Sequence, residues 1–206
     1  MWTVTRQKVL NKREVRVVLT DMQRRAKRTL HARQNLIIFR LATCCGLRVS
    51  EIGGLVLEDV RVENGRPSIR IRPAIAKGGK GRIVPLIFDR GTLEDLRAWK
   101  ETRLAQANET GKSDRFVCSL KPRSFGTPLS RYNLRRRYKG CCRVLGAQRQ
   151  AEITIHHGRH TFISHALCGG YGLVEVKEAA GHSSLGTTSV YAHIVTEDEE
   201  IGDLFK

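Results

Sequence analysis

Apolar residues recur with a helical period in the first part of the chain. One face of a helix predicted over residues 12–28 carries four of them, Val15, Val18, Leu19 and Met22. Asn11 is placed to cap this helix, because an asparagine side chain accepts hydrogen bonds from the first turn. Residues 31–45 form a second predicted helix with apolar side chains on most faces, and Gly46 ends it. We therefore expect the second helix to be buried.

In the middle of the chain the apolar pattern becomes alternating, which is typical of strands. Residues 68–72 alternate cleanly, residues 82–84 do so again, and Val60 and Val62 indicate a further short strand. The glycine-rich residues 77–81 lie between the two clearer strands and predict the turn of a β-hairpin. This stretch is not a P-loop, because it lacks the Gly-Lys-Ser/Thr ending and the helix that follows one.

Helical patterning returns after the hairpin. Apolar residues mark one helix at Leu93, Leu96, Trp99 and Leu104. Residues 111–114 break it, and Ser130 is placed to cap another helix over residues 131–145. The last third of the chain is predicted to be helical, with breaks at residues 169–172 and at Gly181.

The length of 206 residues predicts one domain with short appendages. Residues 1–12 are basic and lack apolar periodicity, so we interpret them as a linker or an artificial end of the chain. At the other end, residues 194–206 form a predicted acidic tail.

The charge adds a polyanionic partner to this picture. The chain has 37 Lys and Arg against 20 Asp and Glu, a net charge of +17. The part after Tyr191 has a balance of −4, which leaves +21 for the rest. Nucleic acid is favoured over a membrane surface, because the charge is rich in arginine and guanidinium groups pair bidentately with phosphate. The acidic tail is not expected to lie on the polyanion.

Six cysteines are present without a C-x-x-C spacing. No secretory signal precedes them, and no apolar run approaches the length of a transmembrane helix. We interpret the cysteines as reduced thiols of a cytoplasmic protein that does not enter a membrane.

The residues at positions 156, 159 and 160 share one helical face, because they are spaced i, i+3 and i+4. Two interpretations stay open. His156 and His160 have a zinc-binding spacing, although Arg159 between them would repel a metal ion. Alternatively, Arg159 binds phosphate and His156 transfers protons. In that case His160 packs in the core with a backbone or carboxylate partner.

Tyr191 and Arg48 complete a set of groups suited to phosphodiester chemistry. A phenol with a pKa of about 10 is a poor nucleophile unless cations stabilise its phenolate. Arg48 supplies a cation far upstream, and Glu51 lies three residues on, where an i,i+3 ion pair would hold the guanidinium. Arginines and histidines together supply this stabilisation without a metal ion.

Three segments carry these residues, and a fourth covers the predicted hairpin. Each resembles a conserved part of the tyrosine recombinases, also called phage-type integrases. They follow the family's order and are Cys45–Ile52, Ala76–Leu86, His156–Phe162 and Gly181–His193. The resemblance implies an α+β fold that is mostly α-helical, namely a DNA breaking-rejoining catalytic domain with a small antiparallel β-sheet. That fold agrees with the alternating pattern seen independently near residues 68–86.

The resemblance also implies how the scissile phosphate is bound. Arg48 and Arg159 would clamp it, and Glu51 would orient Arg48. His156 and His182 would hydrogen-bond its non-bridging oxygens and assist proton transfer.

For the reaction itself, the resemblance implies that Tyr191 forms a 3′-phosphotyrosyl link and that Lys77 protonates the departing 5′ hydroxyl. The ester keeps the bond energy, so neither ATP, a metal ion nor another cofactor is expected. The expected protein is a site-specific DNA recombinase that is cytoplasmic and associated with the nucleoid. It would be monomeric off DNA and tetrameric on paired double-stranded sites.

Three points stay open at this stage. A type IB topoisomerase uses similar residues, and a non-catalytic DNA-binding module would share the charge. Tyrosine recombinases usually carry a helical DNA-binding domain before the catalytic one, so this chain is expected to be either an excised piece or a naturally short protein. The acidic tail docks on a neighbouring protomer, packs on its own domain or stays disordered.

Overall fold

The computed structural model describes residues 6–182 except 64 and 112, together with residues 184, 186, 188 and 191. Its helices are α1 (Lys12–Ala26), α2 (Leu30–Thr43), α3 (Val49–Gly54), α4 (Arg90–Thr110), α5 (Arg131–Cys141), α6 (Ala147–Glu152), α7 (Ile155–Cys168) and α8 (Leu173–Ala180). Its strands are β1 (Val60–Arg61), β2 (Ser68–Ile71) and β3 (Arg82–Pro85). The expected α+β fold, mostly helical with a small antiparallel sheet, is confirmed.

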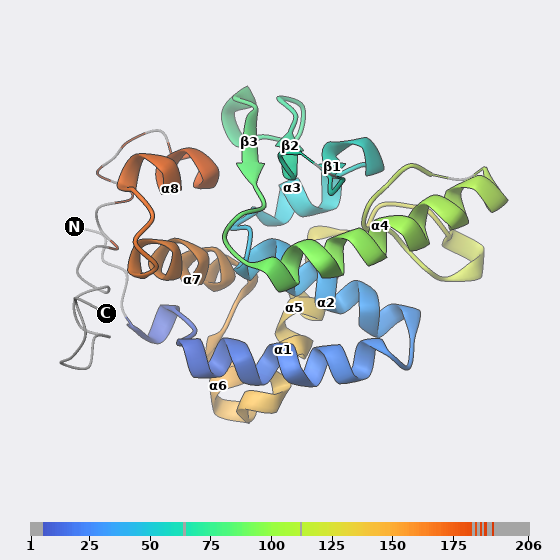
Figure 1. The fold of residues 1–206 in the computed structure, drawn as a ribbon. Coiled ribbons are helices and arrows are strands. Elements are labelled where there is room, and N and C mark those ends of the chain that lie inside the picture. Colours follow the sequence, from blue (N-terminus) through green and yellow to red (C-terminus); the bar gives the residue numbers. More distant parts are fainter. Residues whose placement is uncertain are drawn as a thin grey trace.

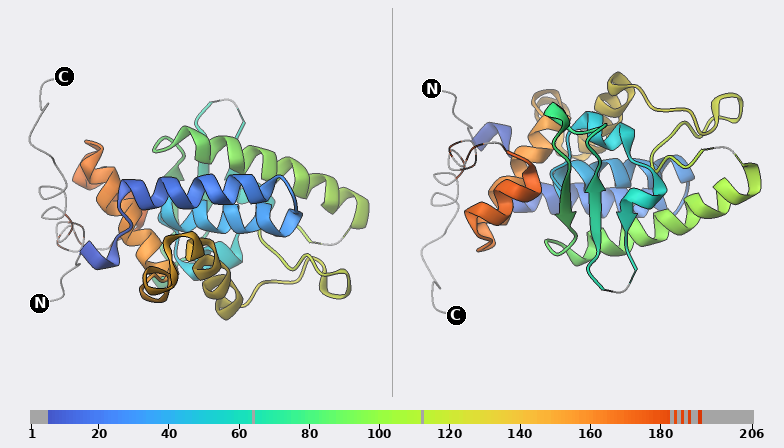
Figure 2. Two further views of the ribbon diagram at one scale, coloured as in Figure 1. Left: turned by 90° about the horizontal axis from the view of Figure 1, so that it is seen from below. Right: turned by 90° about the horizontal axis from the view of Figure 1, so that it is seen from above.

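Helix α2 is the centre of the domain. Every residue from Leu36 to Thr43 is buried, as the apolar residues on most of its faces predicted. Helices α1, α4, α5 and α7 pack against it. Seen from below it lies behind α1, and seen from above it lies behind the sheet (Figures 1 and 2). Burial of so apolar a helix contributes much of the core, because apolar area removed from water stabilises the fold.

The segment before α1 belongs to this core. Asn11 caps α1 as predicted, and it exchanges reciprocal hydrogen bonds with Glu14. However, Val9 and Leu10 are 6% and 0% exposed. The linker expected over residues 1–12 is therefore wrong for these two positions. Two adjacent apolar residues are too few to show a period, so the sequence pattern missed them.

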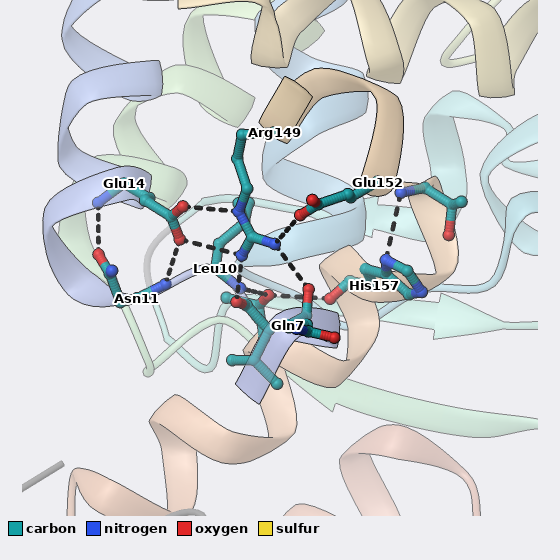
Figure 3. A network of polar contacts seen from close by, with 10 residues as sticks. Gln7, Leu10, Asn11, Glu14, Arg149, Glu152 and His157 are labelled. Carbon is teal, nitrogen blue, oxygen red and sulfur yellow. Dashed lines mark hydrogen bonds and ion pairs between the residues drawn. The ribbon is translucent and has the colours of Figure 1, made fainter. Parts of the chain in front are cut away.

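Arg149 holds this segment in place (Figure 3). Its Nε lies 2.7 Å from Oε1 of Glu14, and its guanidinium also donates to the carbonyls of Gln7 and Val9. Next to these contacts, the Leu10 amide donates to Oγ1 of Thr161 on α7, at 2.9 Å. The start of the described chain is thereby tied to the helix that carries His156 and Arg159.

The strands lie in the order β1-β2-β3, and both pairs are antiparallel. In the register, Ile69 faces Val84, and both side chains are fully buried. The sheet and α3 lie on the opposite side of α2 from α1, and β3 lies beside α8 (Figures 1 and 2). The hairpin was predicted correctly, but its strands are joined by a long connection, residues 72–81, which contains a 3-10 turn, Lys77–Gly79.

The helix predicted over residues 131–145 is shorter than expected. Ser130 caps it as predicted, but α5 ends at Cys141 and a 3-10 turn follows, Cys142–Leu145. The Cys142 amide bonds the carbonyl of Lys139, which tightens the last turn. None of the helices in the described part of the chain is long and apolar enough to cross a membrane.

Candidate active site

Arg48, Arg82 and Arg159 converge on the C-terminal end of α8, and we call these residues the arginine frame. Their guanidinium groups donate to three consecutive carbonyls of residues 179–181. The pairs are Arg82 to Ala179 at 2.8 Å, Arg159 to Ala180, and Arg48 to Gly181 at 3.0 Å. The last carbonyls of a helix lack partners within it and carry partial negative charge, so they favour cations.

Glu51 binds two members of this frame, Arg48 and Arg82. Its carboxylate is fully buried and lies 3.1 Å from Nη1 of Arg48. Arg82 binds the same carboxylate through both terminal nitrogens, at 2.7 and 2.9 Å. Burial raises the pKa of Glu51, but the hydrogen bonds and charge of Arg82, with those of Arg48, outweigh it and lower the pKa. The carboxylate therefore stays ionised and fixes both guanidinium groups.

The contact between Arg48 and Glu51 is the one predicted from their spacing. Glu51 also accepts a hydrogen bond from the Arg48 amide at 2.8 Å, since it lies in the first turn of α3. Arg82 was not predicted as part of the site. It opens β3, and its partners are 31 and 97 positions away, so no local pattern indicates them.

Arg159 is the most enclosed cation of the frame, at 2% exposure. It also donates to the carbonyl of Gly46 at 2.6 Å. Burial and the nearby charge of Arg48 lower the pKa of Arg159 to about 9, although Glu51 opposes this shift. Two cations thus lie close enough to repel one another, and an anion between them would relieve the repulsion.

Gly46 allows this approach. Its φ of +67° lies in the left-handed region, and a Cβ there would come within 2.3 Å of the Phe162 ring. A side chain at position 46 would therefore push α7, and Arg159 with it, away from α2.

His156 and His182 come from different elements and border the frame. Burial, followed by the charges of Arg159 and Arg48, lowers the pKa of His156. The same causes lower the pKa of His182 to about 3. Its Nδ1 lies 3.0 Å from Oγ1 of Thr188. Both imidazoles are therefore neutral near pH 7 and face a surplus of positive charge.

Tyr191 is buried next to His160 and His182, at 2% exposure. Its hydroxyl shares a hydrogen bond with Nδ1 of His160, and its ring centre is 6.4 Å from that of His182. Burial raises the pKa of Tyr191 to about 12, against the influence of Arg159. Burial, then His156, lowers the pKa of His160 to about 3. For His160 we expected a backbone or carboxylate partner, and the structure shows the phenol as a partner.

Lys77 is exposed on the 3-10 turn between β2 and β3. It lines a groove of about 1300 Å³ together with Arg48 and His156. Its charge contributes to the lowered pKa of His156, which places it within electrostatic reach of the site. The sequence-predicted residues are thus brought together, with Lys77 at the rim.

The same groove is also lined by a basic face of α5 that was not singled out from the sequence. It is lined by Arg131, Tyr132, Arg135, Arg136 and Lys139. A cluster of arginines around residues 131–137 was the available signal. The groove therefore carries positive charge from α5 as well as from Arg48 and Lys77.

The described residues offer no third ligand for a zinc ion bound by His156 and His160. Among the residues that the structure covers, no group of three or more His, Cys, Asp or Glu side chains could hold a metal ion. The acidic tail, residues 194–206, lies outside the described residues.

Comparisons with known proteins agree with this geometry. The chain matches the phage integrase family over residues 8–198. The tyrosine recombinase XerC of Corynebacterium efficiens is 32% identical over 165 residues, which are 80% of this chain and 48% of that protein. The tyrosine recombinase XerD of Pseudomonas aeruginosa is 35% identical over 150 residues, or 73% and 46% of the two chains. The chain thus spans about half the length of the curated relatives it matches.

Solved structures share the fold. The site-specific recombinase XerH in a post-cleavage complex with difH DNA superposes with a TM-score of 0.72 and 25% identity, covering 92% of this chain and 50% of that one. A lambda integrase tetramer bound to a Holliday junction gives a TM-score of 0.64 at 16% identity, covering 96% and 51%. The latter likeness concerns the fold alone.

Proposed function

Since the chain belongs to the phage integrase family, we propose that residues 1–206 act as the catalytic domain of a tyrosine-type site-specific DNA recombinase. It cleaves and rejoins DNA through a 3′-phosphotyrosyl intermediate, without ATP, a metal ion or another cofactor. One observation carries the proposal: mutually repelling cations, Arg48 and Arg159, lie beside neutral histidines, and the charge of Arg159 acts on the buried phenol of Tyr191. Such a site favours a phosphate over a neutral substrate.

The scissile phosphate binds between Arg48 and Arg159, and His156 and His182 donate to its non-bridging oxygens. Carbonyls at the C-terminal end of α8 hold both arginines before substrate arrives, and the Glu51 carboxylate also holds Arg48. The cations are therefore preorganised for the negative charge that develops in the transition state, and such preorganisation is usually the largest single contribution to catalysis.

Tyr191 attacks the phosphorus, and the bond from phosphorus to the 5′ oxygen breaks. The phenol loses its proton to His160, which is hydrogen-bonded to it. Without DNA this transfer is strongly unfavourable, because the phenol has a pKa of about 12 and the imidazole one of about 3. A phosphate anion nearby raises the imidazole pKa and so eases the transfer. Lys77 supplies the proton that the departing 5′ oxygen takes up.

Double-stranded DNA lies in the groove between the lysine turn and α5. Arg131, Arg135 and Arg136 line the same groove as Lys77, where they neutralise backbone phosphates. Two structures with the same fold are a lambda integrase dimer bound to a core site and a lambda integrase tetramer bound to a Holliday junction. In our proposal this chain likewise forms a tetramer on paired sites. It is a monomer off DNA, in the cytoplasm in association with the nucleoid.

The test is covalent trapping on nicked suicide duplexes with a randomised core, in the presence of EDTA. We expect an SDS-stable protein–DNA adduct whose modified peptide contains Tyr191. DNA binding without an adduct would indicate a non-catalytic module. Relaxation of supercoiled plasmid that lacks any selected site would indicate a topoisomerase. Activity that EDTA abolishes and zinc or magnesium restores would contradict the metal-free reaction.

A further inference from the structure

The connection between β2 and β3, residues 72–81, carries Lys77, and we call it the lysine segment. It begins at an ion pair with a buried carboxylate. Arg72 donates from Nε to both oxygens of Asp59, at 3.0 and 2.9 Å, and from Nη2 to the carbonyl of Gly54 at 2.9 Å. The Asp59 side chain is fully buried. The first residue of the segment is therefore fixed to the chain around α3.

Directly after the segment, Arg82 makes an equivalent contact. Both oxygens of Glu51 accept from its terminal nitrogens, and Nε donates to the carbonyl of Ala179. Glu51 is fully buried as well. A bidentate pair between an arginine and a carboxylate fixes direction as well as distance. Both ends of the lysine segment are thus held by a buried carboxylate, which Arg82 binds through two nitrogens and Arg72 through Nε alone.

Packing is tight near these ends. Ile75 fills the space over Gly54, where an added Cβ would come within 2.5 Å of it. A Cβ on Gly81 would lie 2.9 Å from the carbonyl oxygen of Ile71, so the two ends of the segment touch. These contacts leave little freedom at the base of the segment.

The middle of the segment differs. Gly78 and Gly79 are exposed and have φ values of +76° and +71°. A Cβ on either one would meet no atom of the described residues within 4 Å. Glycines with open space around them can change their backbone conformation without a steric clash. Lys77 is therefore carried by a tip that is free to move on a fixed base.

We propose that Arg72 and Arg82 are positioning residues that fix the base of the lysine segment, so that Lys77 reaches the leaving oxygen above the arginine frame. This inference rests on the proposed function, in which Lys77 is the acid. Arg82 has a second effect, because its partner Glu51 also holds Arg48. Arg72 touches no member of the frame in the described contacts, so it reports on the segment alone.

The experiment measures single-turnover cleavage of two suicide substrates, one with a normal 5′-bridging oxygen and one with sulfur in its place. A thiolate departs without protonation, so a defect in delivering the acid disappears on the sulfur substrate. For Arg72→Gln we expect a loss of about tenfold to about a hundredfold with oxygen, because misplacing a catalytic group by a small distance has costs of this order. With sulfur, Arg72→Gln should cleave like the unmodified protein.

Arg82→Gln should be rescued only in part by sulfur, because Glu51 and Arg48 lose a partner as well. Arg61→Gln is the matched control, because it removes the same charge from an exposed position of the neighbouring strand β1. It should leave cleavage of both substrates unchanged. Circular dichroism and DNA affinity check that each variant is folded. If Arg72→Gln does not fold, Arg72→Lys is measured in its place.

Equal losses on both substrates for the Arg72 variants, or no loss with oxygen, would overturn the inference. The double variant Lys77→Ala with Arg72→Gln should be no slower than Lys77→Ala alone, and an additive loss would also overturn it. If Lys77→Ala itself is not rescued by sulfur, both the inference and the role of Lys77 fail. Failure of the proposed function is distinguishable, because the unmodified protein would then form no adduct at all.

Discussion

The arginine frame and the lysine segment hold their cations in opposite ways. Arg159 is 2% exposed and its guanidinium is bonded to two backbone carbonyls. Lys77 is exposed at the tip of a turn that contains two glycines with positive φ. The frame is fixed before DNA binds, whereas the segment is fixed only at its base.

The difference corresponds to the two tasks in the proposed reaction. Charge on the phosphate develops at one place, so fixed cations stabilise it without reorganisation. The leaving oxygen moves away as its bond breaks, and its acid must follow it and then release the product strand. A rigid clamp beside a mobile acid is therefore a reasonable division between the two regions.

The largest expected effect is that of Tyr191→Phe, which removes the nucleophile that both regions serve. Cleavage should fall below detection, and DNA affinity should stay within about twofold, because phosphate contacts dominate binding. Covalent trapping and a mobility-shift titration measure the two properties. An adduct formed by the Phe variant would mean that another residue attacks.

Next comes Lys77→Ala, which tests the mobile region alone. Cleavage of the oxygen substrate should fall by about 10² to 10⁴, the usual range for a lost general acid. Cleavage of the sulfur substrate should change little. Lys80→Ala, three residues along the same segment, is the control and should change both rates only slightly. If the Lys80 variant shows the preferential loss instead, Lys80 is the acid.

Glu51→Gln and Asp59→Asn compare the regions directly. Each removes a buried charge that pairs with arginine, so each should lower the free energy of unfolding by about 3 kcal/mol. Glu51→Gln should slow cleavage of both substrates, because Arg48 loses its support. Asp59→Asn should slow the oxygen substrate only, because it supports the segment. Identical substrate profiles for the two variants would contradict the separation of the regions.

The sequence predicted the parts of this site that depend on local spacing. Arg48 and Glu51 are three residues apart and His156, Arg159 and His160 share a helical face, so periodicity was enough to group them. The cap at Asn11 and the alternating strands followed from the same kind of local rule, whereas α2 ends at Thr43, two residues before the predicted end at Cys45.

The sequence did not predict what depends on tertiary packing. The contact between Arg82 and Ala179 spans 97 positions, and that between Arg48 and Gly181 spans 133. The acceptors are backbone carbonyls, which every residue has, so no residue type marks them. The anchor at Asp59 was missed for a related reason, since its partner Arg72 looks like any exposed residue of an alternating strand.

The smallest expected effect is on the dependence of stability on pH. The pKa values of His160 and His182 are about 3 in the folded domain, against 6.5 for an ordinary histidine. The unfolded chain therefore binds protons below pH 6.5 that the folded domain refuses, so stability is complete above that pH and is lost toward pH 3. We expect the free energy of unfolding to fall by about 1 to 2 kcal/mol per pH unit in this window.

Urea denaturation between pH 7.5 and 5 measures this loss. His160→Gln should flatten the profile, whereas His31→Gln, an exposed position on α2, should not.

The same prediction extends to DNA, because a phosphate between Arg48 and Arg159 raises the pKa of the neighbouring imidazoles. Binding should therefore take up protons near pH 6, which calorimetry in buffers of different ionisation enthalpy detects. A stability that does not change with pH, or binding without proton uptake, would mean that the frame is not short of negative charge before DNA arrives.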